Sequence, residues 1–145
     1  MHMATPAYLL RLMHYVKLTR VTLGPEDLTC MAFVTELRAA TLGGRLRAVW
    51  THPANELAGL SPRSPRPMLV RAAIARALGL ITGSSDYLFL WEGGSLAMEF
   101  KSDKGSLTDG QRDFRSWCAD MGVPFHVVRS ASAGLQILRD AGVLA

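Results

Sequence analysis

Cysteine is scarce in this chain: Cys30 and Cys118 are the only two among 145 residues, and their spacing fits neither a metal site nor a disulfide framework. This scarcity favours a reducing compartment, and we expect the cytoplasm. Long apolar runs are also missing. Arg11, His14 and Lys17 interrupt the apolar opening segment too often for a signal peptide, and no run approaches membrane-spanning length. The sequence therefore predicts a soluble protein with no membrane partner.

Charge is sparse as well, at 19% of residues, and it is unbalanced, with 16 Lys and Arg against 12 Asp and Glu. The net charge of +4 favours a polyanionic partner such as nucleic acid. Apolar residues make up 49% of the chain, which is enough for one core. We expect one domain over residues 24–145, preceded by an N-terminal extension over residues 1–23 that contains a short helix.

Hydrophobic periodicity predicts helices over residues 7–18, 26–42, 68–80, 108–121 and 133–141. Short apolar or alternating runs predict strands over residues 45–50, 86–91, 96–101 and 125–129. Residues 57–67 are expected to form a basic loop, because they contain three prolines and proline lacks a backbone N–H. This mixture of elements predicts an α/β fold. On the helix over residues 108–121, the side chains expected in the core are Phe114, Trp117, Cys118 and Met121.

The strands over residues 86–91 and 96–101 are expected to form a β-hairpin. Its turn is placed at Gly93 and Gly94, because glycine readily adopts the positive φ angles of a two-residue turn. Residue 92 then pairs with residue 95. In this register Asp86 lies diagonal to Glu99 on one face of the hairpin, with roughly 7–8 Å between the two backbones.

Carboxylates at this separation can converge on one cation. Mg²⁺ prefers oxygen ligands and is usually held by one or two carboxylates together with substrate phosphates. Lys101 follows Glu99 by two residues, so both side chains point to the same face of the strand. The ammonium group can meet negative charge that develops on a phosphate. Asp86, Glu99 and Lys101 therefore predict metal-dependent hydrolysis of a phosphodiester.

Four short segments follow one another along the chain: His52-Pro-Ala-Asn55-Glu56, Gly83-Ser-Ser-Asp86, Glu99-Phe-Lys101 and Gly105-Ser-Leu-Thr-Asp-Gly-Gln111. In this order and spacing they resemble the VRR-NUC nucleases of the PD-(D/E)XK superfamily, which are similar to Holliday junction resolvases. The likeness covers residues 26–138. The chain departs from the family pattern at Cys30, Leu57 and Ser85.

The resemblance implies a restriction-endonuclease-like mixed β-sheet flanked by helices, and a metal-dependent DNA endonuclease that acts on branched DNA such as Holliday junctions. It also implies a homodimer, because cutting a junction requires two active sites. The metal, Mg²⁺ or Mn²⁺, would be held by Asp86, Glu99, the backbone carbonyl of Phe100 and a helix acid. We expect this acid to be Glu26, with Glu36 as its competitor.

Further roles follow from the same resemblance. Lys101 would position the attacking water, and Gln111 would hold Lys101 or that water. Two of these residues have a structural alternative: Gln111 completes a capping box with Thr108, and Glu26 offsets the dipole of its helix. Contacts to DNA are expected from basic and loop residues, which otherwise form a solvated surface. These residues are Arg63, Arg66, Arg71, Arg76, His52 and Asn55, of which His52 and Asn55 could instead support the metal site from behind its ligands.

The departures from the family pattern motivate an alternative function, a non-catalytic nucleic-acid-binding or interaction module that retains the nuclease fold. A hydrolase of small phosphate esters is disfavoured, because the chain lacks a phosphate-cradling glycine loop such as a Walker motif.

Overall fold

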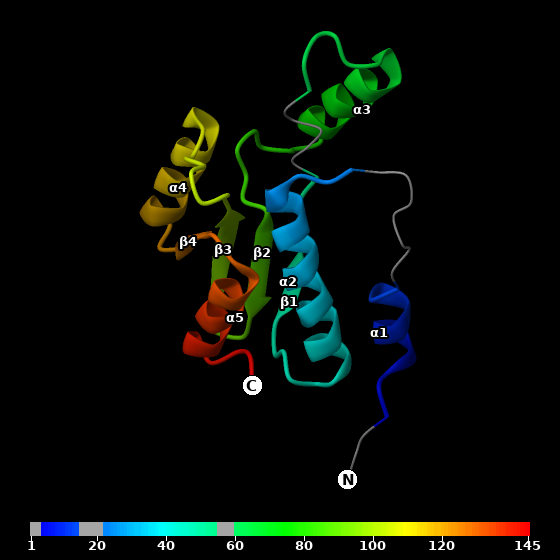
Figure 1. Ribbon diagram of the computed structural model, residues 1–145, viewed down its shortest axis with the longest axis vertical. Helices are drawn as coiled ribbons and strands as arrows, with labels where there is room; N and C mark the ends of the chain where they lie inside the picture. Colours follow the sequence, from blue (N-terminus) through cyan, green and yellow to red (C-terminus); the bar gives the residue numbers. More distant parts are fainter. Residues whose placement is uncertain (1–3, 15–21, 55–59) are drawn as a thin grey trace. The chain divides into compact units, whose positions relative to one another are not determined.

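The computed structural model describes residues 4–14, 22–54 and 60–145, which contain five helices and four strands. Contacts divide the chain into two units. The helices and strands of both are labelled in Figure 1. The first comprises Met1–Ala48 and Val128–Ala145, and the second comprises Val49–Val127. No helix in the described ranges combines the length and the apolarity that crossing a membrane requires.

The first unit is mainly helical, with α1 (Ala7–Leu12), α2 (Pro25–Leu42) and α5 (Ala131–Asp140). Proline opens α2 because its missing N–H is not needed in the first turn, and acids follow it there. Helices α2 and α5 pack against each other. Phe33, Leu37 and Leu138 from these two helices are fully buried. A single β-bridge joins Leu46 to Leu144 near the C-terminus.

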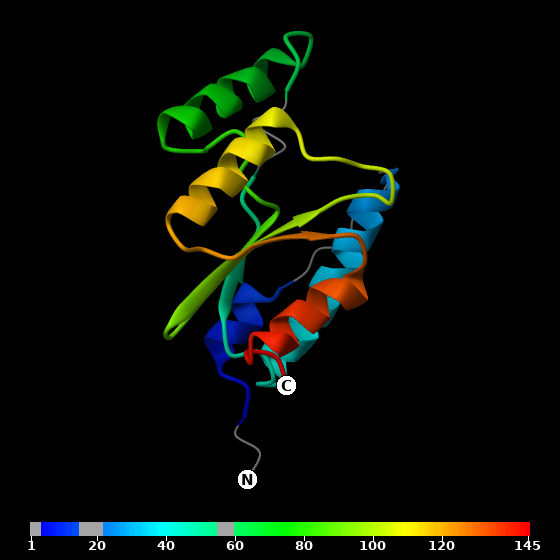
Figure 2. The same cartoon turned by 90° about the vertical axis from the view of Figure 1, so that its left-hand side faces the viewer.

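The second unit is built on β1 (Val49–Thr51), β2 (Tyr87–Trp91), β3 (Gly94–Phe100) and β4 (Phe125–Val128), which lie in this order in one sheet. The pairs β1–β2 and β2–β3 are antiparallel. Helix α4 (Asp109–Asp120) forms the crossover from β3 to β4, so β4 runs parallel to its neighbour (Figure 2). Helix α3 (Arg66–Ala77) lies between β1 and β2 in the sequence. The predicted α/β class with a mixed sheet is confirmed.

Strand β1 and helices α3 and α1 depart from their predicted bounds by three or more residues at one end. Strand β1 is shorter than expected and begins at Val49, since Leu46 pairs with the C-terminus instead. Helix α3 begins at Arg66, inside the predicted loop, because Pro67 falls in the first helical turn, where no N–H is needed. Helix α1 ends at Leu12 rather than at residue 18.

The turn of the central hairpin also differs. Strands β2 and β3 close at the pair Trp91↔Gly94, so the two-residue turn is Glu92-Gly93, and Gly93 has a φ of 83°. Gly94 belongs to β3, where a Cβ atom would lie 2.6 Å from the Trp91 indole. The indole therefore occupies the space that a side chain at position 94 would need. The predicted turn at Gly93-Gly94 is wrong by one residue, which shifts the pairing register by two.

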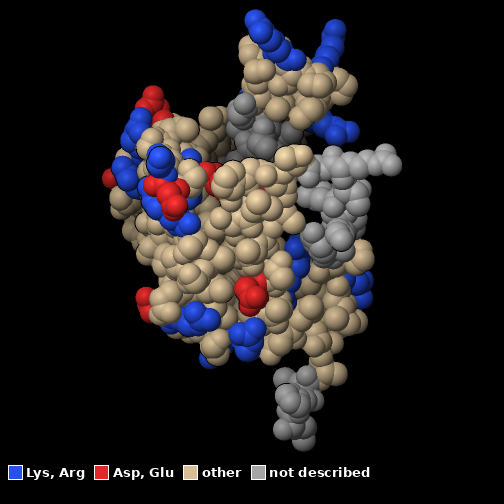
Figure 3. Space-filling view, viewed as in Figure 1, with Lys and Arg blue, Asp and Glu red and all other residues tan. Residues whose placement is uncertain are grey.

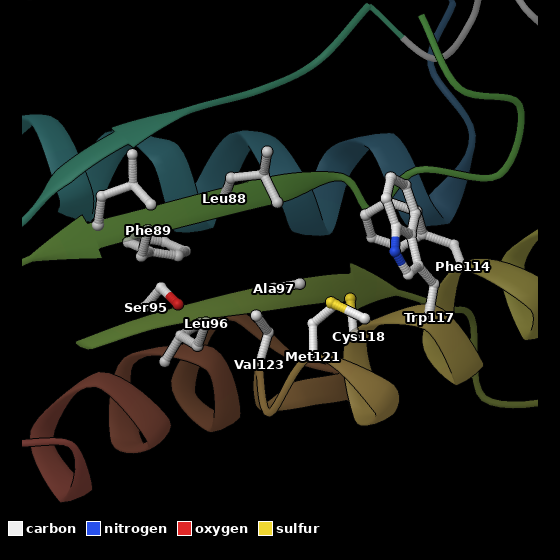
Figure 4. Close-up of a pocket in the computed structure, with 11 residues that line it drawn as sticks. Leu88, Phe89, Ser95, Leu96, Ala97, Phe114, Trp117, Cys118, Met121 and Val123 are labelled. Carbon is white, nitrogen blue, oxygen red and sulfur yellow. The ribbon is translucent and has the colours of Figure 1, made fainter.

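Helix α4 packs over the β2–β3 hairpin and leaves an apolar pocket of about 310 Å³ between them (Figure 4). Cys118 at this contact is buried, as predicted. Trp117 and Met121 were expected in the core, but they are 52% and 66% exposed. Both side chains line the open pocket between α4 and the hairpin. The predicted helix is confirmed, and the predicted burial of Trp117 and Met121 is wrong.

Candidate active site

Asp86 and Glu99 meet where β2 begins and β3 ends. Extending the observed register by one residue beyond Tyr87↔Met98 places Asp86 directly opposite Glu99, rather than diagonal to it. The Asp86 backbone N–H donates to Glu99 Oε2 at 3.2 Å, and the Phe100 N–H donates to Asp86 Oδ2 at 2.7 Å. Each carboxylate therefore accepts a hydrogen bond from the backbone of the opposite strand. We call this pair of contacts the carboxylate clasp.

Lys101 and Gln111 converge on one oxygen of the clasp. Lys101 Nζ lies 3.5 Å from Glu99 Oε1, and the Gln111 side-chain amide donates to the same oxygen at 2.5 Å. The Glu99 side chain is 1% exposed and the Lys101 side chain 10% exposed. The structure thus places the Gln111 amide nitrogen on Glu99, whereas the expected partner was Lys101 or the attacking water. The Lys101 ammonium reaches the clasp from its more accessible side.

Gln111 also carries the predicted capping box of α4, which is confirmed. Its Oε1 accepts the Thr108 backbone N–H at 2.9 Å, while its own N–H donates to Thr108 Oγ1 at 3.3 Å. One amide group therefore closes the helix terminus with its oxygen and holds Glu99 with its nitrogen. The cap and the contact to Glu99 coexist in one side chain, and a catalytic role for Gln111 stays a prediction.

Two glycines, for which the sequence predicted no packing role, bring the start of α4 to the clasp. Gly83 has a φ of 88°, and a Cβ atom there would lie 2.2 Å from the carbonyl carbon of Gly110. The loop before Asp86 and the first turn of α4 therefore approach each other backbone to backbone. A signal existed at Gly110, because glycine within a first helical turn costs helix stability and needs a packing reason.

His52 and Ser85 support the same strand end. His52 follows β1, and its Nδ1 lies 2.5 Å from the backbone oxygen of Asp86. Ser85 is fully buried, and its hydroxyl donates to the Tyr87 carbonyl at 3.3 Å. The predicted DNA contact Asn55 falls outside the described residues.

Burial and charge act together on Glu99. Burial is the largest influence and the Asp86 carboxylate adds to it, and together they raise the Glu99 pKa from 4.5 to about 7. Lys101 and the hydrogen bond from the Asp86 backbone lower this pKa, but they do not offset the other two effects. Two carboxylates share this site with one ammonium group, so further positive charge placed beside Asp86 would favour the ionised form of Glu99.

The arginines expected to contact DNA do gather on one segment. Arg63 precedes α3, and Arg66, Arg71 and Arg76 lie on it with exposed side chains. Residues 57–85 contain no Asp or Glu. The α3 surface in Figure 3 accordingly shows basic side chains without acidic ones. We call Arg63, Arg66, Arg71 and Arg76 the arginine segment.

The helix acid belongs to the first unit. Glu26 lies in the opening turn of α2, where Gly24 provides no side-chain cap and acidic side chains offset the helix dipole. Its competitor Glu36 is exposed on the same helix. The contribution of either acid to a metal site stays a prediction.

A hard divalent cation fits the donors of the clasp. Two carboxylates and the Phe100 backbone carbonyl are oxygen donors of the kind that Mg²⁺ and Mn²⁺ prefer. Within the described ranges no three His, Cys, Asp or Glu side chains are grouped to hold a metal. Mg²⁺ in proteins usually takes several of its ligands from water and substrate.

Comparison of the chain with protein-family models, with curated proteins and with solved structures finds no match in any of the three.

The raised pKa of Glu99 predicts how stability depends on pH. Between pH 4.5 and about 7 the folded chain keeps a proton that the unfolded chain has released. The free energy of unfolding should therefore fall as pH rises through this window, by about 3 kcal/mol from this group alone. Urea unfolding in EDTA, at several pH values from 4.5 to 8, measures the slope. Glu99→Gln should flatten it, whereas the exposed Glu92→Gln should keep it, and equal slopes in all three proteins would contradict the assignment.

The backbone contact at Gly83 predicts a local stability difference. Gly83→Ala and Gly93→Ala both place a Cβ on a residue with a φ near 85°, which costs about 1–2 kcal/mol. Only position 83 adds a clash with the first turn of α4, since nothing lies within 4 Å of a Cβ at position 93. Gly83→Ala should lower the free energy of unfolding by at least about 2 kcal/mol more than Gly93→Ala. Equal losses in urea unfolding would show that the close approach is not required.

Proposed function

We propose that this protein is a metal-dependent DNA endonuclease that hydrolyses phosphodiester bonds. The observation that carries the proposal is the carboxylate clasp, in which Asp86 directly precedes β2, Glu99 lies on the adjacent β3, and the Lys101 ammonium is 3.5 Å from Glu99 Oε1. Paired acids beside one cationic group, at the end of a sheet, suit the hydrolysis of a charged phosphate ester. The four sequence segments shared with VRR-NUC nucleases point to the same chemistry.

Asp86, Glu99 and the Phe100 carbonyl would hold Mg²⁺ or Mn²⁺, with Glu26 as a further candidate. When bound, such an ion lowers the pKa of a coordinated water and neutralises charge on the scissile phosphate. The Asp86 carboxylate keeps its orientation through the Phe100 N–H, and Glu99 keeps its orientation through the Asp86 N–H and Gln111. The protein therefore supplies preoriented oxygen donors, which lowers the cost of assembling the site.

Lys101 would act on the substrate side of this site. Its ammonium lies beside Glu99 yet stays partly accessible, so it can orient a water molecule and stabilise negative charge on the phosphate during attack. Gln111 would act through Glu99, since its amide nitrogen donates to the carboxylate rather than toward Lys101. The cap of α4 fixes the Gln111 amide in this orientation.

The arginine segment would bind the DNA backbone. Its four guanidinium groups lie within residues 63–76, and no acid within residues 57–85 opposes them. Such groups position nucleic acid through phosphates without reading its sequence. The proposal extends to branched DNA and to a homodimer, because cutting both strands at a junction requires two centres. The exposed apolar side chains of α1, including Leu10 and Leu12, are candidates for the dimer contact.

Loss of a clasp carboxylate should abolish cutting. Asp86→Asn, Glu99→Gln and Lys101→Ala should each lower the cleavage rate at least about 100-fold, since the first two weaken metal binding and the third removes the ammonium that stabilises charge on the phosphate. Glu92→Gln, at the opposite end of the same hairpin, should cut at the wild-type rate. The measurement uses linear, flapped and four-way DNA with Mg²⁺ or Mn²⁺, and with EDTA as the blank.

Wild-type cutting by Asp86→Asn or Lys101→Ala would remove this mechanism. Binding of the same DNA by the wild-type chain, with no cutting in either metal, would favour the non-catalytic nucleic-acid-binding module instead.

The arginine segment predicts a salt-dependent signature. Arg71→Ala and Arg76→Ala should each weaken binding of all DNA sequences alike and reduce the slope of log affinity against log salt by about 1. Arg139→Ala, on α5, should leave both quantities unchanged. Fluorescence anisotropy in EDTA at several salt concentrations measures binding without cutting. An unchanged slope in both α3 variants would exclude this segment from the DNA interface.

A further inference from the structure

The Asp86 carbonyl receives its hydrogen bond from a side chain where the sheet cannot supply one. Strands β1 and β2 pair as Val49↔Leu90 and Thr51↔Leu88, and continuing this register by two residues places Pro53 opposite Asp86. Proline has no backbone N–H to donate, so the ladder cannot extend to this carbonyl. The Nδ1 atom of His52 lies 2.5 Å from it instead.

The chemistry of this contact fixes the role of the imidazole. A carbonyl oxygen only accepts hydrogen bonds, so Nδ1 of His52 must carry the proton and donate. The contact is therefore available to the neutral ring and to the charged ring alike. It holds the backbone of Asp86 from the β1 side, while the Asp86 N–H donates to Glu99 Oε2 on the β3 side.

A row of rings accompanies this hydrogen bond across the sheet. The His52 ring lies 5.3 Å from the Tyr87 ring, and Tyr87 meets Phe100 edge to face at 5.7 Å. Tyr87 and Phe100 directly follow Asp86 and Glu99 in the sequence, and both are buried. Because side chains alternate along a strand, these rings pack on the opposite face from the carboxylates. The backbone at this end of β2 and β3 therefore has packed rings on one face and hydrogen-bonded carboxylates on the other.

We propose that His52 is a positioning residue for the metal centre, acting through the Asp86 carbonyl rather than on substrate. This inference rests on the proposed function, in which Asp86 is a metal ligand. The His52-Pro53 dipeptide works as a unit: the proline ends the backbone ladder, and the preceding histidine donates in its place. Groups that orient a ligand in this way commonly change metal affinity about 10- to 100-fold when removed.

The test distinguishes the hydrogen bond that the His52 side chain donates from the packing of its ring. In His52→Asn the amide nitrogen can take the place of Nδ1, whereas in His52→Gln it reaches only to the place of Nε2, and His52→Phe keeps the ring without a donor. Isothermal titration calorimetry with Mn²⁺ in the absence of DNA measures affinity apart from cutting. We expect His52→Gln and His52→Phe to lose about 10-fold or more in Mn²⁺ affinity, and His52→Asn to retain most of it.

Two further variants fix the interpretation. Thr51→Ala alters β1 beside His52 without touching Asp86 and should bind Mn²⁺ like wild type, so a loss there would assign the effect to the strand and overturn the inference. Asp86→Asn should lose Mn²⁺ binding. If it does and His52→Phe and His52→Gln do not, positioning by His52 is wrong and the metal centre stands. If Asp86→Asn binds Mn²⁺ like wild type, the proposed metal centre fails, and positioning by His52 fails with it.

Discussion

The clasp between Asp86 and Glu99 is the contact on which the rest of the second unit depends. Each carboxylate takes a backbone N–H from the other strand, so the acids replace the sheet ladder where regular pairing stops. Glu99 stays buried beside a like charge only because hydrogen bonds and one ammonium group surround it. Leaving a buried carboxylate without such partners costs several kcal/mol. The surrounding elements are arranged to provide these partners.

Each neighbouring element reaches the clasp by a different physical means. Helix α4 reaches it through the Gln111 amide, and it can approach closely because Gly83 and Gly110 carry no side chains. Strand β1 reaches it through an imidazole, since Pro53 cannot donate. The arginine segment belongs to the same unit but carries charge rather than support. Support of the clasp and the densest positive charge are thus assigned to separate parts of this unit.

Much of this unit was predictable from the sequence, because its signals are local. The capping box at Thr108 and the alternation of side chains along 96–101 depend on neighbours within a few residues. The hairpin register was not predictable from two adjacent glycines, since only Gly93 lies in the turn, while Gly94 belongs to β3 beneath the Trp91 indole. The Gln111–Glu99 and His52–Asp86 contacts join segments 12 and 34 residues apart. Periodicity carries no information about contacts at those separations.

The two side-chain hydrogen bonds of Gln111 couple the first turn of α4 to Glu99. Its oxygen closes the first turn of α4 and its nitrogen holds Glu99, so the helix end cannot fray without releasing the carboxylate. Conversely, any rotation of Glu99 that breaks this bond also loosens the turn. The order of the first turn of α4 and the orientation of the Glu99 carboxylate therefore both depend on the planar amide of Gln111. Fraying of the first turn of α4 would therefore disturb the hydrogen bonding of the buried Glu99 side chain through the Gln111 amide.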